Sequence, residues 1–169
     1  EIGADQRERQ KRDGERDHHL PWYAPTRLFD VAIGREHGWL SGGHVASWSR
    51  PASWADNVPR AAELGRGSPT GLVCCRQRAF PQRYRGGLFS AEWTFGRIYF
   101  LPLTPSGSTF TSQPEAFLQS RGSSGFAPVD LEIGPRGDLF VAMGGRRTQG
   151  SVYRIYYAGE GEQPVVRDA

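Results

Sequence analysis

The sequence predicts an all-β fold, a partial β-propeller with about two to three four-stranded antiparallel blades. Three observations lead to this expectation. The 22 glycines and 12 prolines make turns frequent and long helices unfavourable. Aromatic residues, at 12% of the chain, favour strands. One block of side chains recurs after about 50 residues, which is the period of a propeller blade.

The length of the chain limits how much of a propeller it forms. Its 169 residues have room for roughly three blades, whereas a closed propeller takes about four or more. We therefore expect a segment of a larger propeller, whose partners are the remaining blades or a second chain.

The repeat consists of two strands and the hairpin that joins them. Residues of the first strand recur at an offset of 51: Leu88, Phe89 and Ala91 are matched by Leu139, Phe140 and Ala142. Residues of the second recur at an offset of 54: Gly96, Ile98 and Tyr99 are matched by Gly150, Val152 and Tyr153. Each copy follows a proline-led strand, at 69–73 and at 128–133. This order at a fixed period is typical of propeller blades, and a β-sandwich would not need to repeat its side chains.

Along the chain we expect a charged tail or truncated loop at 1–19, propeller blades at 20–157 and a polar tail at 158–169. Residues 26–33 read as a strand, and residues 40–67 as a long loop with room for one short helical turn near 53–63. The first full blade has strands at 69–75, 86–92, 96–103 and 109–118, and the second at 128–133, 138–143 and 151–157. The second blade lacks a fourth strand, and we expect that strand to come from the N-terminal end of a longer chain.

Composition excludes several classes of protein. The net charge of +3 and the pI of 9.1 come from scattered arginines, whereas nucleic-acid binding requires a basic patch or stripe. No apolar run approaches the roughly 20 residues that span a bilayer, so we expect no transmembrane segment in this chain. Residues 1–20 contain no signal-peptide core, so an export signal would lie outside this sequence.

The two cysteines, Cys74 and Cys75, are adjacent. Neighbouring strand residues point to opposite faces, so we expect no bond between them but one buried and one half-exposed thiol. Their spacing fits neither a zinc site nor a haem attachment motif.

Aromatic residues in the predicted loops are candidates for ligand contacts. Flat rings pack against sugar C–H faces, so we predict substrate contacts from Trp22, Tyr23 and Trp39. Packing between blades is the alternative use of these rings. We also predict that Glu92 and Trp93 line the mouth of a binding site, with Glu92 contacting substrate.

Several motifs in series resemble one family. They are Leu20–Arg27, His37–Trp39, Gly67–Gly71, Phe80-Pro81, Tyr84–Phe89, Trp93–Arg97 and Gly144–Arg146. Together they resemble the membrane-bound dehydrogenase domain family of planctomycetes and verrucomicrobia, which is related to the soluble glucose/sorbosone dehydrogenases. The resemblance covers about residues 13–157.

The resemblance implies a six-bladed parent, a periplasmic or extracellular location, and oxidation of sugars or alcohols with pyrroloquinoline quinone (PQQ) and calcium. The catalytic histidine of the enzymatic relatives lies upstream of this chain. Where those relatives place a cofactor-contacting lysine the chain reads Glu92–Arg97, and where they place paired arginines it reads Phe126–Asp130. A quinone with three carboxylates needs cationic partners.

The candidate cofactor contacts that follow from the resemblance are Trp93, Thr94, Arg97 and Arg146. The acidic loop that precedes Pro-Trp-Tyr in the family corresponds to Asp13, Glu15 and Asp17, which could supply oxygen ligands to calcium. A solvated charged segment is the alternative for these three.

Three functions are compatible with these observations. The chain is the C-terminal segment of a PQQ-dependent sugar or alcohol dehydrogenase, a non-catalytic propeller module that binds carbohydrate or protein, or a truncated product without independent activity. Hydrolase chemistry has no support, because no serine lies in a nucleophile-elbow context.

Overall fold

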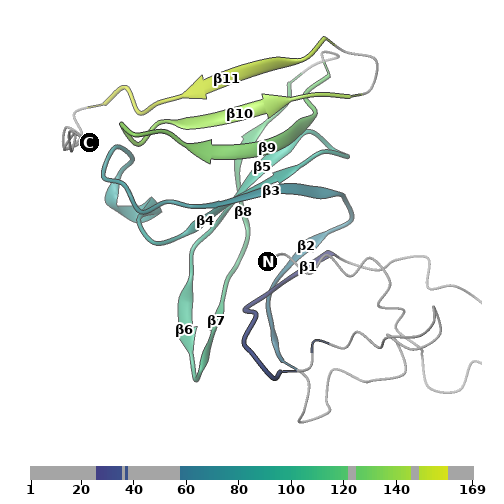
Figure 1. The fold of residues 1–169 in the computed structure, drawn as a ribbon, viewed down its shortest axis with the longest axis vertical. Coiled ribbons are helices and arrows are strands. Elements are labelled where there is room, and N and C mark those ends of the chain that lie inside the picture. Colours follow the sequence, from purple (N-terminus) through teal and green to yellow (C-terminus); the bar gives the residue numbers. More distant parts are fainter. Residues whose placement is uncertain (1–25, 36, 38–57, 122–124, 146–148, 160–169) are drawn as a thin grey trace, which may run out of the picture. The chain divides into compact units, whose positions relative to one another are not determined.

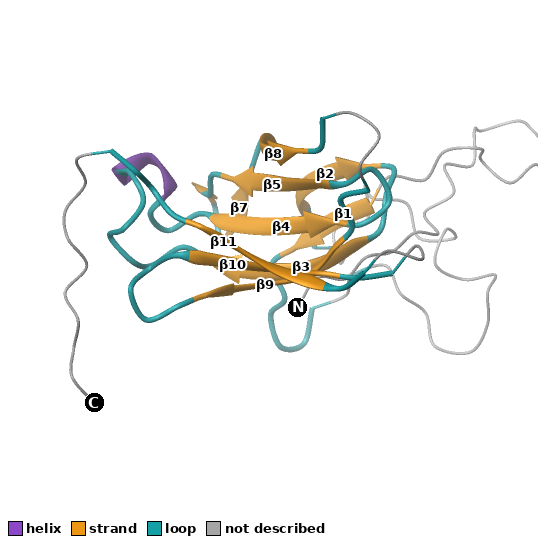
Figure 2. Cartoon of the chain, turned by 90° about the horizontal axis from the view of Figure 1, so that it is seen from above, coloured by secondary structure: helices purple, strands orange, loops and turns teal. Residues whose placement is uncertain are grey.

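The computed structural model describes residues 26–35, 37, 58–121, 125–145 and 149–159. The described chain is all-β, as predicted, with antiparallel sheets and one short 3-10 helix at Gln82–Tyr84 (Figures 1 and 2). Its strands are β1 Thr26–Phe29, β2 Arg60–Gly65, β3 Pro69–Cys74, β4 Leu88–Glu92, β5 Arg97–Leu101, β6 Thr104–Ser106, β7 Thr109–Thr111, β8 Glu115–Gln119, β9 Pro128–Ile133, β10 Leu139–Met143 and β11 Ser151–Ile155.

The chain divides into two compact units. The first comprises the residues up to Gly67 together with Pro105–Thr111, and the second comprises the rest. In the first unit β1 pairs with β2, β2 contacts β7, and Arg35 Nη2 donates to Ser108 Oγ at 3.0 Å. Strand β1 ends at Phe29 and is thus shorter than the predicted strand at 26–33.

The predicted loop at 40–67 is wrong over residues 60–65, which form β2. The helical turn near 53–63 is equally wrong over 60–63, and the residues before 58 lie outside the described ranges. Ala61, Ala62 and Leu64 are buried, and the β2 backbone pairs with β1. Pairing and burial thus override the helical propensity of an Ala-Ala-Glu-Leu segment.

The second unit contains a four-stranded sheet of order β3-β4-β5-β8 and a three-stranded sheet of order β9-β10-β11. The predicted strand at 109–118 is wrong as a single element. Residues 109–111 form β7, which pairs with β6, and only β8 is the fourth strand of the sheet. The β6–β7 hairpin turns at Gly107, whose φ of +60° suits the left-handed region that glycine tolerates.

The repeat is present in the pairing register of both sheets. Phe89 lies opposite Phe100, and Ala91 lies opposite Ile98. At the same offsets, Phe140 lies opposite Arg154, and Ala142 lies opposite Val152. The two hairpins are therefore built in the same register from matched positions.

The core lies between these two sheets. One face of the four-stranded sheet contributes Phe89, Ala91, Ile98 and Phe100, and the three-stranded sheet contributes Leu131, Ile133, Leu139 and Val141. Phe80, Tyr84 and Phe117 extend the core as an aromatic cluster around Phe89, whose ring centroid lies 4.6 Å from that of Phe117. Burial of this many large apolar side chains is the main force that holds the two sheets together.

The two sheets approach most closely at Gly71. A Cβ on Gly71 would lie 2.7 Å from the backbone nitrogen of Leu131 and 2.8 Å from Cα of Asp130. The adjacent Thr70 donates from Oγ1 to the carbonyl oxygen of Pro128 at 2.8 Å. Strands β3 and β9 therefore pack backbone to backbone at a point where only glycine fits.

The two sheets stack with their repeat-equivalent faces pointing in the same direction. Phe89 and Ala91 face the second sheet, but their equivalents Phe140 and Ala142 do not face the first. Because strand residues alternate between faces, burial of Leu139 and Val141 in the shared core places Phe140 and Ala142 on the opposite face. Equivalent faces thus point in one direction through the stack rather than toward each other.

Both cysteines are free thiols. Cys74, at the end of β3, is half-buried, and Cys75 is buried, which confirms the predicted arrangement. Burial raises the pKa of the Cys75 thiol, Cys74 adds to the rise, and the charge of Arg85 opposes it.

Candidate functional site

In the second unit, every other connection between successive strands lies at the same edge of the two sheets. The chain enters β3 at Ser68, turns between β4 and β5 at 93–96, enters β9 after Ala127 and leaves β10 at Gly144. Trp93 N donates to Ser68 O at 3.0 Å, and Gly144 N donates to Ala127 O at 3.1 Å. We call this set, Ser68, Glu92–Arg97, Phe126–Ala127 and Gly144–Gly145, the Glu92 edge. Surface turns gathered at one end of a rigid sheet stack are where binding sites commonly form.

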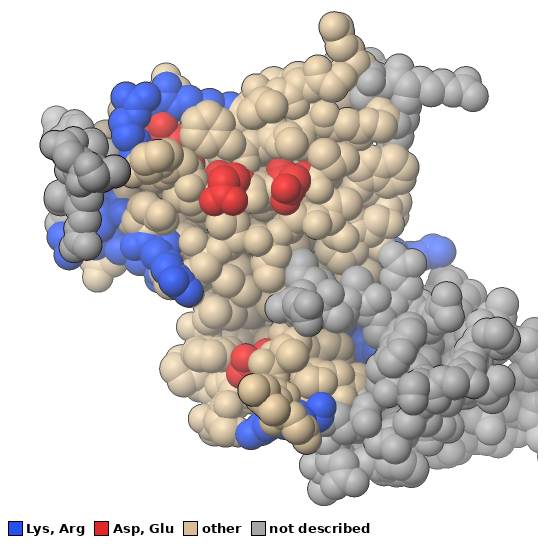
Figure 3. Space-filling model, in the orientation of Figure 1, with Lys and Arg blue, Asp and Glu red and all other residues tan. Residues whose placement is uncertain are grey.

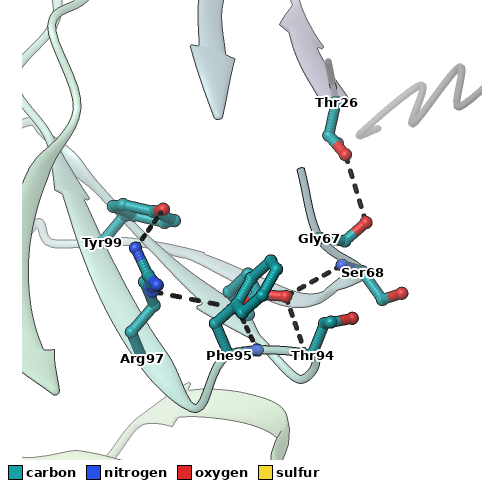
Figure 4. Close-up of polar contacts among 8 residues, drawn as sticks. Thr26, Gly67, Ser68, Thr94, Phe95, Arg97 and Tyr99 are labelled. Carbon is teal, nitrogen blue, oxygen red and sulfur yellow. Dashed lines mark hydrogen bonds and ion pairs between the residues drawn. The ribbon is translucent and has the colours of Figure 1, made fainter. Parts of the chain in front are cut away.

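Glu92, the last residue of β4, lies inside this edge rather than on its surface. Its side chain is only 2% exposed. Oε1 accepts hydrogen bonds from Ser68 N at 2.9 Å and Thr94 N at 2.7 Å, and Oε2 accepts one from Phe95 N at 2.7 Å (Figure 4). Three main-chain donors satisfy the buried carboxylate, which would otherwise be costly to bury. The carboxylate stabilises the turn that follows it, and its contact with substrate stays a prediction.

Arg97, the first residue of β5, is held by its neighbours. Nη1 donates to Tyr99 Oη at 3.2 Å, and Nε lies 4.0 Å from Glu92 Oε2 (Figure 4). The guanidinium carbon lies 5.3 Å from the ring centroid of Phe95 and 5.7 Å from that of Tyr99, within the range of cation–π attraction. The positive charge is therefore stacked between rings and faces a carboxylate.

Trp93 connects the turns of the two sheets. Its indole Nε1 donates to the carbonyl oxygen of Gly144 at 3.2 Å. A Cβ on the next residue, Gly145, would lie 3.2 Å from the same nitrogen. The ring is half-buried and lies against Gly145 in the turn that follows β10. Thr94 is half-buried beside it and is bound through its backbone by Glu92.

Several predicted site residues lie outside the described ranges. They are the substrate candidates Trp22, Tyr23 and Trp39, the cofactor candidate Arg146, and the calcium candidates Asp13, Glu15 and Asp17. The structure thus brings together Glu92, Trp93, Thr94 and Arg97 and describes no other predicted site residue. Within the described ranges, no group of three or more His, Cys, Asp or Glu could hold a metal ion.

Three residues that contact Glu92 or Arg97, namely Ser68, Phe95 and Tyr99, were not among those predicted for the site. Ser68 contributes through its main chain, which a sequence pattern does not reveal. Phe95 and Tyr99 flank Arg97 at two residues on either side. Strand residues two apart share a face, so the spacing of Arg97 and Tyr99 was the one available signal.

The described residues of this edge do not fit a quinone with three carboxylates. Such a cofactor needs cations that are free to bind it. Arg97, the cation that the structure places here, already contacts Tyr99 and Glu92. The buried Glu92 carboxylate would also repel an anionic ligand placed against it.

No family model, curated protein or solved structure matches the chain. Among the described residues, no helix has the length and apolar character needed to cross a membrane.

Proposed function

We propose that the chain supplies consecutive blades of a β-propeller of the glucose/sorbosone-dehydrogenase-like type. In this proposal the blades form part of a carbohydrate-binding face, and the redox centre of the parent lies elsewhere. The observation that carries the proposal is the stacking of two repeat-equivalent sheets in the same sense.

Stacking in one sense distinguishes a propeller from a duplicated sandwich. A sandwich made from two equivalent sheets buries equivalent faces against each other. Here Phe89 points into the shared core and its equivalent Phe140 points out of it. A head-to-tail interface of this kind leaves one face open for the next unit, and rings form when the rotation closes. Each sheet is also a meander in chain order, as in a propeller blade.

A binding role suits the Glu92 edge better than a redox role. Its fixed charges are paired within the turn, whereas Phe95 is 49% exposed beside them. An exposed ring on a rigid turn is suited to the C–H face of a sugar. Quinone-dependent oxidation by the parent would rely on residues beyond the described part of this chain.

The test combines a redox assay with a binding assay. The chain is incubated with PQQ, calcium ions, an artificial electron acceptor and a panel of sugars. We expect no dye reduction above the quinone-free control. Calorimetric titration with the same sugars is expected to show binding that Phe95→Ala removes and Phe110→Ala, on the β6–β7 hairpin, retains. Quinone-dependent dye reduction would place the redox centre in this chain and contradict the proposal, and equal binding by both variants would move the sugar site away from this edge.

A further inference from the structure

The β9-β10-β11 sheet has an outer face, opposite the one in the core. Two rows of paired residues make it up: Asp130, Ala142 and Val152 in one, and Glu132, Phe140 and Arg154 in the other. Val152 is 69% exposed, and both acidic residues are exposed. In Figure 3 acidic side chains stand apart on a largely uncharged surface, with basic side chains gathered at its margin.

The four-stranded sheet shows what covers the equivalent face. Its matching rows contain Phe89 with Phe100 and Ala91 with Ile98, and this face is buried against the next sheet. Aligning the proline-led strands matches Gly71 with Asp130 and Val73 with Glu132. The outer face is thus the position at which the repeat places a further sheet.

The outer face nevertheless differs in charge at four matched positions. Phe100, which packs over Gly87, corresponds to Arg154, and Gly87 corresponds to Asp138. Arg154 donates to Asp138 Oδ2 from Nε at 2.7 Å and from Nη2 at 2.6 Å. Where the first sheet has an aromatic ring packed over glycine, the second sheet has an ion pair. Both members of the pair belong to the same repeat, so the pair needs no outside partner.

The remaining two differences leave negative charge without a counterpart. Asp130 and Glu132 accept hydrogen bonds from the backbone nitrogens that follow them, and neither forms an ion pair with another described residue. They lie two residues apart on one strand face, about 7 Å along the strand. Like charges so placed repel each other, and a basic partner would relieve the repulsion.

Asp130 also excludes the packing seen between β3 and β9. That packing needs glycine at the matched position, because a Cβ on Gly71 would meet the backbone of Leu131. A further sheet must therefore sit farther from β9 than β9 sits from β3. The outer face of a second copy is not the partner either, since acidic side chains would meet acidic side chains.

We propose that the outer face docks a β-sheet face that is apolar at its centre and carries arginine or lysine over Asp130 and Glu132. The inference rests on the proposed blade stacking and specifies the chemistry of the next blade. Ala142 and Val152 supply the apolar centre, and the two carboxylates select the partner by charge.

A charge-reversed form of the chain, Asp130→Arg with Glu132→Arg, provides a probe of this chemistry. We expect wild type and the probe to be monomeric alone and to form a one-to-one complex when mixed, measured by sedimentation velocity. Raising the salt concentration from 50 to 500 mM is expected to weaken the complex about tenfold or more. The milder Glu132→Arg chain is a second probe, expected to bind less tightly.

Two control variants separate docking from general charge attraction. Glu63→Arg with Glu115→Arg makes the same change in net charge on other strands, and it should not bind wild type. Val152→Lys in the wild-type partner should abolish binding to the probe. Binding by neither probe, equal binding by the control, or self-association of wild type would overturn the proposal. Thermal unfolding of each sample reports the stack itself, so loss of docking with normal unfolding leaves the proposed function standing.

Discussion

Trp93 donates its indole hydrogen to the carbonyl oxygen of Gly144, and this bond joins the turns of two successive sheets. The bond lies at the rim of the core rather than inside it. It therefore fixes how the turns meet, while the apolar faces fix how the sheets stack.

Replacing Trp93 with phenylalanine should cost about 1 kcal/mol or slightly more, because the hydrogen bond is lost together with the part of the indole that carries it. Urea denaturation measures the change. The matched control, Tyr156→Phe, removes a hydroxyl from an exposed ring and should change stability by less than about 0.5 kcal/mol. Equal effects from both substitutions would show that the bond to Gly144 does not contribute.

Replacing Glu92 with glutamine should destabilise the second unit by about 2 kcal/mol or more. The amide keeps the shape of the side chain but turns its NH₂ group toward backbone donors that need an acceptor. Glu115→Gln is the control, since Glu115 is exposed and its ion pair with Arg83 is a surface pair worth about 1 kcal/mol at most. A Glu92→Gln chain as stable as the control would rule out a carboxylate-centred turn.

Replacing Gly71 with valine should destabilise the stack by about 2–3 kcal/mol, because the new side chain meets the β9 backbone. Chemical denaturation and amide exchange in β9 report the loss. In Gly144→Ala the new Cβ would lie 3.7 Å from Val129 Cγ1, an ordinary contact, so stability should change little. Wild-type stability in the Gly71→Val chain would mean that β3 and β9 do not pack as described.

Stability should fall in alkaline solution because of Cys75. Its pKa is raised by burial in the folded chain, so the native thiol keeps its proton when the unfolded thiol has lost it. The stabilisation is fully present at neutral pH and is lost as pH rises above about 9 toward the raised native value. Urea midpoints at pH 8 and pH 10 should differ more in wild type than in Cys75→Ala. A parallel decline in both chains would assign the alkaline loss to other groups.

Much of the second unit could be predicted from the sequence because it is repeated. Matched side chains at offsets of 51 and 54 predicted both hairpins, and the structure adds their register, in which Phe89 lies opposite Phe100. Strand β2 could not be predicted, since its composition favours helix and only pairing with β1 decides its state. The β6–β7 hairpin could not be predicted, because two three-residue strands are too short to show the alternation of polar and apolar residues.

The site was less predictable than the fold. Glu92 ends β4 and Arg97 begins β5, and the sequence predicted a substrate contact for the first and a cofactor contact for the second. Their partners are backbone amides and the faces of aromatic rings, and of these only Tyr99 was indicated by residue spacing. The sequence located the turn correctly, but the burial of Glu92 depends on the course of the Ser68 backbone.

The β6–β7 hairpin delays the completion of the first unit during biosynthesis. The hairpin belongs to the first unit, yet β3, β4 and β5 of the second unit precede it in the chain. A ribosome therefore releases β1 and β2 long before β7, their partner in the same unit, has been synthesised. The first unit therefore cannot finish folding until β3, β4 and β5 of the second unit have also been synthesised, although β8 to β11 of the second unit still follow it. A nascent chain stalled before Pro105 would carry β1 and β2 without the hairpin that completes their unit.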